Sequence, residues 1–71
     1  MTRKDYRAIA EEIRFIMDHR LSSDPAINGI QRNIMLIATK AIADVMARDN
    51  SRFDRQRFYA ACGFMPEDYN A

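Results

Sequence analysis

The sequence predicts an all-α fold: a single helical domain over residues 1–71, with two main antiparallel helices and a short C-terminal helix. Three observations support this fold class. Apolar residues recur at the spacing of helix faces, and no stretch alternates apolar and polar residues as a half-buried strand does. In addition, only two glycines and two prolines interrupt the 71 residues, so long helices can continue without a break.

The first helix is expected over residues 3–19. Thr2 is a suitable N-cap, and Asp5 at the third helical position gives a near capping box. Apolar residues then recur on one side at i, i+3 and i+4, which predicts a half-buried helix. They are Tyr6, Ile9, Ala10, Ile13, Ile16 and Met17.

The second helix is expected over residues 25–48. Pro25 disfavours a helical backbone at Asp24, which suits Asp24 as the N-cap and Pro25 as the first helical residue. Gly29 costs roughly 1 kcal/mol relative to alanine, which leaves open whether the first turn is regular. One apolar stripe comprises Ile27, Ile30, Ile34, Ile37, Ala38, Ala41 and Val45, and a second, displaced around the cylinder, comprises Met35, Ile42 and Met46. A helix that is apolar on more than one side is central or buried.

The third helix is expected over residues 54–62. Asp54 is placed as its N-cap, and Phe53 with Phe58 has the spacing of a hydrophobic staple. Gly63 suits the position after the helix, where Phe64 can fold back on the last turn. We expect the tail over residues 64–71 to be loosely ordered, although Phe64 and Tyr69 are able to dock.

The length of the chain predicts that dimerisation completes the domain. Chains of this size usually need a disulfide, a metal or a partner subunit, and one cysteine and one histidine supply neither of the first two. Symmetric dimers are the commonest oligomers, so we expect a homodimer, or a host protein as partner if the chain is monomeric. The expected dimer or partner surface consists of Met35, Leu36, Ile42 and Met46.

No residue is predicted to be catalytic or to bind a metal or cofactor. Cys62 falls at a helix C-terminus, where the helix dipole opposes thiolate formation, and His19 is interpreted as a residue of the last helical turn. The adjacent Glu11 and Glu12 point in different directions on a helix, and no glycine-rich loop is present to hold a phosphate. We therefore expect a protein that is not an enzyme.

A cluster of polar and cationic side chains at the start of the third helix leaves an alternative open. Arg52, Arg55, Gln56 and Arg57 are suited to reading bases in a helix-turn-helix regulator, with Arg3, Lys4 and Arg7 adding phosphate contacts. Against this, the helix has only about two turns, its connection lacks the glycine of that motif, and the formal charge of the chain is only +1. An ion pair with Asp5 or Glu12, or contact with an acidic partner, would equally explain the arginines.

The two ends of the chain are similar to those of small phage and prophage proteins. The opening residues are Thr2-Arg3-Lys4-Asp5-Tyr6, and the ending over residues 53–63 has the form F-D-R-x-R-F-x-x-A-C-G. This family has no assigned activity, so the resemblance assigns no residue a role. It implies a small accessory protein that acts by binding, and often by blocking, a host protein. Without a signal peptide or membrane segment, the expected location is the cytoplasm of the bacterial host cell.

Overall fold

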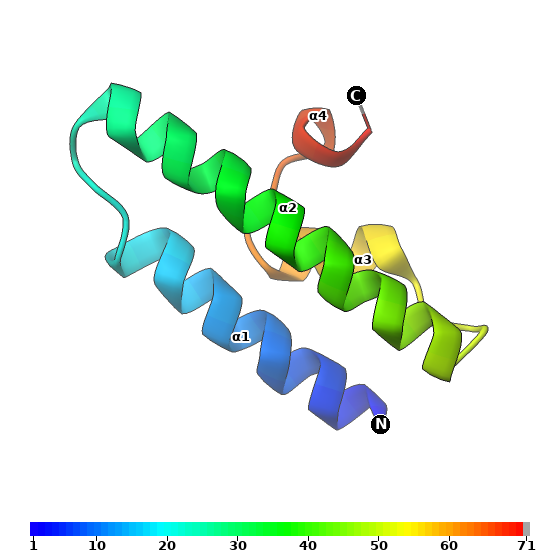
Figure 1. The fold of residues 1–71 in the computed structure, drawn as a ribbon. Coiled ribbons are helices and arrows are strands. Elements are labelled where there is room, and N and C mark those ends of the chain that lie inside the picture. Colours follow the sequence, from blue (N-terminus) through cyan, green and yellow to red (C-terminus); the bar gives the residue numbers. More distant parts are fainter. Residues whose placement is uncertain (71) are drawn as a thin grey trace.

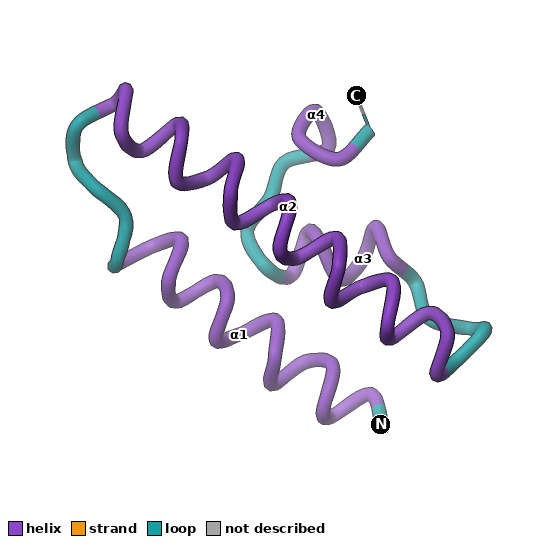
Figure 2. The backbone as a smooth tube through the Cα atoms, viewed as in Figure 1, coloured by secondary structure: helices purple, strands orange, loops and turns teal. Residues whose placement is uncertain are grey.

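The computed structural model describes residues 1–70 and confirms the all-α class. Its helices are α1 (Arg3–His19), α2 (Pro25–Asp49), α3 (Arg55–Ala61) and α4 (Pro66–Tyr69). Figure 1 shows α1 and α2 running side by side in opposite directions, with α3 crossing behind α2. Figure 2 shows that only short loops join the helices, and no strand occurs in residues 1–70.

The start of α1 is fixed by the capping box that the sequence predicts. The backbone N–H of Thr2 donates to Asp5 Oδ2 at 2.8 Å, and Thr2 Oγ1 accepts from the backbone N–H of Asp5 at 3.3 Å. The hydrogen bonds from Thr2 hold the pKa of the Asp5 carboxyl below its usual value, because they stabilise its charged form.

Helix α2 is continuous from its first turn, including Gly29. Asp24 caps it by accepting from the backbone N–H of Ala26 at 2.9 Å. The loop before it is tied to the helix, because Gln31 Oε1 accepts from the backbone N–H of Ser22 at 2.7 Å and Asn28 donates to the Ser22 carbonyl at 3.1 Å. These bonds offset the unfavourable helix propensity of Gly29.

Helix α3 is defined at both ends by local contacts. Asp54 Oδ1 accepts from the backbone N–H of Arg57 at 3.0 Å, and the rings of Phe53 and Phe58 lie 5.5 Å apart, which confirms the staple. At the other end Gly63 has a φ of +98°, and the N–H of Phe64 donates to the Tyr59 carbonyl at 3.1 Å. This is a Schellman turn, in which a glycine reverses the chain after the helix.

The core lies where α3 packs against the other helices. Its side chains come from α1, from the middle and end of α2, and from the segment around α3. They are Tyr6, Ala10, Ile13, Met17, Ala43, Met46, Phe58, Tyr59, Cys62 and Phe64. The inner stripe of α1 is therefore the one that its apolar spacing predicts, apart from Ile16, which is exposed.

The tail differs from the loosely ordered segment that the sequence predicts. Phe64 is 4% exposed, and residues after it form α4, whose Tyr69 ring lies 5.2 Å from the ring of Tyr59. The physical reason is the Schellman turn, which directs Phe64 back onto the core and brings the following residues over α3. Residue 71, also part of the expected tail, lies outside the described residues.

Replacing the two glycines by alanine is expected to shift stability in opposite directions. Gly63→Ala should destabilise the fold by about 1–2 kcal/mol, because its positive φ strains an L side chain; its nearest neighbour would be an ordinary 3.8 Å away from the new Cβ. Gly29→Ala should stabilise by up to about 1 kcal/mol, because the new Cβ would meet nothing within 4 Å. Urea unfolding followed by circular dichroism measures the free energy of unfolding of both variants. Equal changes in the two variants would contradict the different backbone roles assigned to Gly63 and Gly29.

A second prediction concerns Thr39, which is 1% exposed and whose Oγ1 has no hydrogen-bond partner among residues 1–70. An unsatisfied buried hydroxyl costs about 1–3 kcal/mol, so Thr39→Val should raise the thermal midpoint. Thr39→Ser is the matched control: it keeps the hydroxyl and loses the methyl group, so it should lower the midpoint. A lower thermal midpoint for Thr39→Val would contradict this prediction and would mean that the hydroxyl has a hydrogen-bond partner in solution.

Candidate functional site

The surface predicted to meet a partner is largely turned inward. Met46 is 1% exposed and belongs to the core, and Met35 and Leu36 are half-buried against it. Only Ile42 of the four residues is exposed, at 38%. The prediction was wrong for Met46 because the inner face of α2 is centred on Thr39, Ala43 and Met46, the side that α3 covers.

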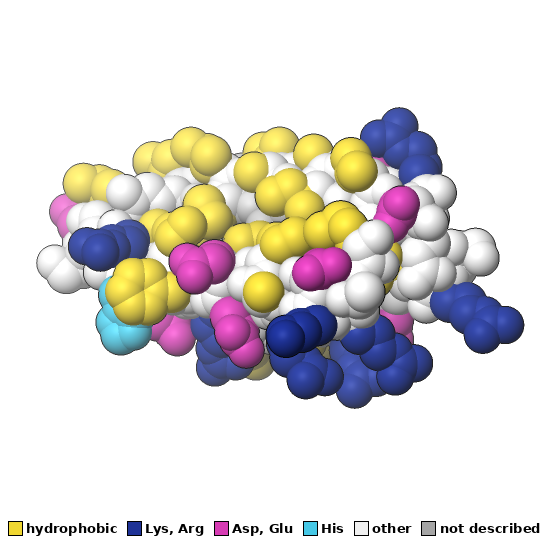
Figure 3. Space-filling model, turned by 90° about the horizontal axis from the view of Figure 1, so that it is seen from below, with side chains coloured by type: hydrophobic (Ala, Val, Ile, Leu, Met, Phe, Trp, Pro, Cys, Tyr) yellow, Lys and Arg dark blue, Asp and Glu magenta, His cyan; other side chains and the backbone are white. Residues whose placement is uncertain are grey.

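The other apolar stripe of α2 faces outward instead. We call it the isoleucine face, and it consists of Ile27, Ile30, Ile34, Ile37, Ala38, Ala41 and Val45. Its large side chains are between 48% and 63% exposed. Figure 3 shows hydrophobic side chains gathered along one side of the molecule and cationic side chains gathered mainly along the opposite side. Sequence analysis found this stripe but took the other one as the contact surface, since periodicity does not say which of two apolar stripes faces the core.

Two members of the predicted polar cluster have partners within the chain. Arg55 forms an ion pair with Asp44 of α2, whereas the sequence analysis considered Asp5 and Glu12 as partners for the cluster. The hydrogen bond to Asp44 raises the pKa of the Arg55 guanidinium. Gln56 donates to Asn70 Oδ1 at 3.2 Å. These contacts disfavour base reading by Arg55 and Gln56, which a helix-turn-helix regulator would require.

The remaining two arginines line a groove with two residues of α1. Arg52 and Arg57 lie on one wall, and Arg3 and Arg7 lie on the other. The groove has a volume of about 420 Å³, and aromatic side chains are also part of its lining. The fold thus brings together arginines from both ends of the chain. The sequence named all four, but their spacing along the chain does not show that they share one groove.

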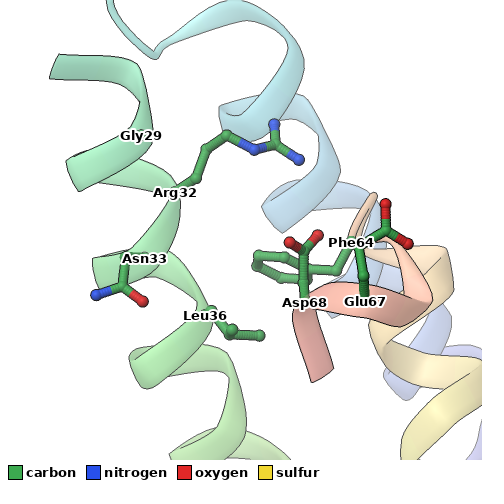
Figure 4. Close-up of a pocket in the computed structure, with 7 residues that line it drawn as sticks. All are labelled: Gly29, Arg32, Asn33, Leu36, Phe64, Glu67 and Asp68. Atoms are coloured by element: carbon green, nitrogen blue, oxygen red, sulfur yellow. The ribbon is translucent and has the colours of Figure 1, made fainter. Parts of the chain in front are cut away.

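A second cavity of about 380 Å³ lies between α2 and the α4 segment. In Figure 4, Arg32 and Asn33 extend from α2, while Phe64, Glu67 and Asp68 come from the opposite side. Asp68 is already engaged, because its Oδ2 accepts from the backbone N–H of Met65 at 2.8 Å. The cavity mixes both signs of charge and holds no nucleophile, so it offers no defined chemistry.

Cys62 and His19 are the residues suited to act as a nucleophile or a general base, and they lie in different surroundings: Cys62 is buried and His19 is exposed. Cys62 is 0% exposed, and burial raises the pKa of its thiol to about 12. His19 lies at the end of α1, with its ring 4.8 Å from the ring of the exposed Phe15. A thiol with so high a pKa stays protonated near neutral pH and is a poor nucleophile.

Among residues 1–70 no group of three His, Cys, Asp or Glu side chains is placed to hold a metal ion. Within the same residues, none of the helices combines the length and apolar character needed to span a bilayer. No protein-family model, curated protein or solved structure matches the chain. The resemblance of its ends to phage and prophage proteins stays a prediction.

The burial of Cys62 predicts that its thiol reacts slowly. A colorimetric disulfide reagent at pH 7.5 should modify the native protein at least about a hundredfold more slowly than the urea-unfolded protein, because only the unfolded chain exposes the thiol. The matched control is the double variant Cys62→Ala/Ala61→Cys, which moves the thiol one residue to an exposed position. Equally fast labelling of native wild type and this control would contradict the buried position.

Proposed function

We propose that this chain is a non-enzymatic protein that acts by protein–protein binding, and that the isoleucine face of α2 is its contact surface. A second copy of the chain is the partner to which we commit. The similarity of the chain ends supports a phage or prophage accessory protein as the biological setting, and a dimer that modulates a host protein fits that setting by analogy.

The observation that carries this proposal is the exposure of the isoleucine face. Four isoleucines and one valine lie more than two-fifths exposed along a single helix. Contiguous apolar patches on soluble proteins mark interaction surfaces, and fully burying one such side chain is worth about 1.5–3 kcal/mol. Arg32 and Lys40 of the same helix segment lie off this stripe, and Asp44, which borders it seven residues after Ile37, is already paired with Arg55.

The spacing of the face favours a second copy over an unrelated occupant. Ile27, Ile30, Ile34, Ile37 and Ala41 follow one another at alternating intervals of three and four residues. This is the seam spacing with which two helices pack knobs into holes. A face that matches its own copy in this way can form a closed, two-fold symmetric contact, and α2 is long enough at 25 residues to supply several turns of it.

The mass of the protein in solution tests the proposal. Light scattering at about 100 µM should give twice the 8.3 kDa of one chain, and Ile34→Glu/Ile37→Glu should give a single chain with unchanged helicity, because four buried charges per dimer would oppose association. Lys40→Glu is the matched control, since it changes the net charge by the same two units from an exposed position off the face. It should remain dimeric.

Two outcomes would overturn the proposed self-association through the isoleucine face. One is a wild-type mass of a single chain at this concentration. The other is dissociation of the Lys40→Glu control to the same degree as the double isoleucine variant, which would indicate a general charge effect and not a contact through the isoleucine face.

A further inference from the structure

The groove lined by four arginines has no role in the proposed contact of the isoleucine face. We propose that it binds an acidic segment of a partner protein, with an apolar side chain of that segment on the groove floor and carboxylates on the two rims. This inference rests on the proposed function in one respect: it takes the chain to be a protein-binding module. It concerns a different surface from the isoleucine face, so it can be tested separately from the proposed dimer.

Both walls of the groove carry arginines. Arg3 and Arg7 stand one helical turn apart on α1, and Arg52 and Arg57 flank the start of α3 on the other wall. All four side chains are exposed, and none forms an ion pair within residues 1–70. Like charges that share a groove repel one another, so an anionic ligand between the walls would relieve that repulsion.

The one carboxylate in the lining does not neutralise this charge by pairing with a guanidinium. Asp54 Oδ1 accepts from the backbone N–H of Arg57 and so caps α3. Guanidinium groups bind carboxylates through paired hydrogen bonds of fixed geometry. Arginines on both walls therefore suit a ligand with several carboxylates spaced along a peptide.

The floor between the rims is aromatic and apolar. The rings of Tyr6 and Phe53 lie 4.9 Å apart in an edge-to-face arrangement, and Phe58 lies next to Phe53. Ala10 and Ala61 complete the floor. The groove has a volume of about 420 Å³, which lies within the range of about 300–1,000 Å³ typical of ligand sites. This volume suits insertion of an apolar side chain.

The same geometry argues against a nucleic acid strand. Single strands bind by stacking successive bases on exposed aromatic faces along a positively charged track, but only Phe53 of the three floor rings is half-buried, and Tyr6 and Phe58 are 8% and 5% exposed. The positive track is also short, because Glu11, four residues after Arg7, places a carboxylate on the same side of α1. A short acidic peptide fits this length, whereas successive phosphates would meet that carboxylate.

Fluorescence anisotropy of a labelled peptide, Glu-Asp-Phe-Glu-Asp, tests the inference at low salt. Wild-type protein should bind it, and Arg7→Glu/Arg57→Glu should weaken binding by at least about tenfold, since both walls lose their attraction. Lys40→Glu/Arg48→Glu is the matched control, with the same change of net charge at exposed positions outside the groove, and should bind within about twofold of wild type. Circular dichroism verifies that each variant is folded.

Two further probes sharpen the result. The peptide Gln-Asn-Phe-Gln-Asn should not bind, because it has the same shape without carboxylates, and a labelled twelve-nucleotide thymidine strand should bind more weakly than the acidic peptide. Equal weakening of acidic peptide binding in the groove variant and the control variant would overturn the proposal. Failure of the wild-type protein to bind the acidic peptide would also overturn it. Tighter binding of the strand, lost in Arg7→Glu/Arg57→Glu, would also overturn it and assign the groove to nucleic acid.

The test is independent of the proposed dimer. Ile34→Glu/Ile37→Glu should keep the affinity of wild type for the acidic peptide, because the isoleucine face does not line the groove. A dimer that does not bind the peptide would overturn the groove proposal alone. A monomer that binds it would overturn self-association alone.

Discussion

The packing of α3 against both long helices is the contact on which the rest of this fold depends. A helix of seven residues is too short to be stable alone, so its position has to come from its surroundings. Asp54 and the Phe53–Phe58 contact fix where it begins, and Gly63 fixes where it ends. Its inner side chains then meet α1 on one side and α2 on the other, and the Schellman turn adds Phe64 to the same core.

This arrangement explains why α2 keeps an exposed apolar face. Helix α3 and the tail pack on the side of α2 that contains Thr39, Ala43 and Met46, and α1 lies beside α2 with its own inner stripe turned to the same core. None of the helices in residues 1–70 packs on the outer side. The face is thus left exposed by the elements that the structure describes, and association is the physical means by which such a face is buried.

Features set by neighbouring residues could be predicted from the sequence, and features set by distant ones could not. The cap at Thr2, the Asp24–Pro25 start and the stop at Gly63 each depend on a few adjacent positions, and the structure places all three where the sequence does. The choice between the two apolar stripes of α2 depends on where α3 docks. Both stripes are uncharged and helical in spacing, so the inward position of Met46 followed only from the assembled fold.

The arginine groove follows from the same antiparallel arrangement. Because α1 and α2 run in opposite directions, the start of α1 lies beside the end of α2 and the connection to α3, and this brings Arg3 and Arg7 opposite Arg52 and Arg57. The apolar floor is the outer edge of the aromatic cluster that positions α3. The contacts that hold α3 in place therefore also shape the groove. A ligand bound there would contact residues at the start of α3, the helix on whose packing the core depends. Binding in the groove should stabilise the whole fold by mass action, because the groove exists only while α3 is docked.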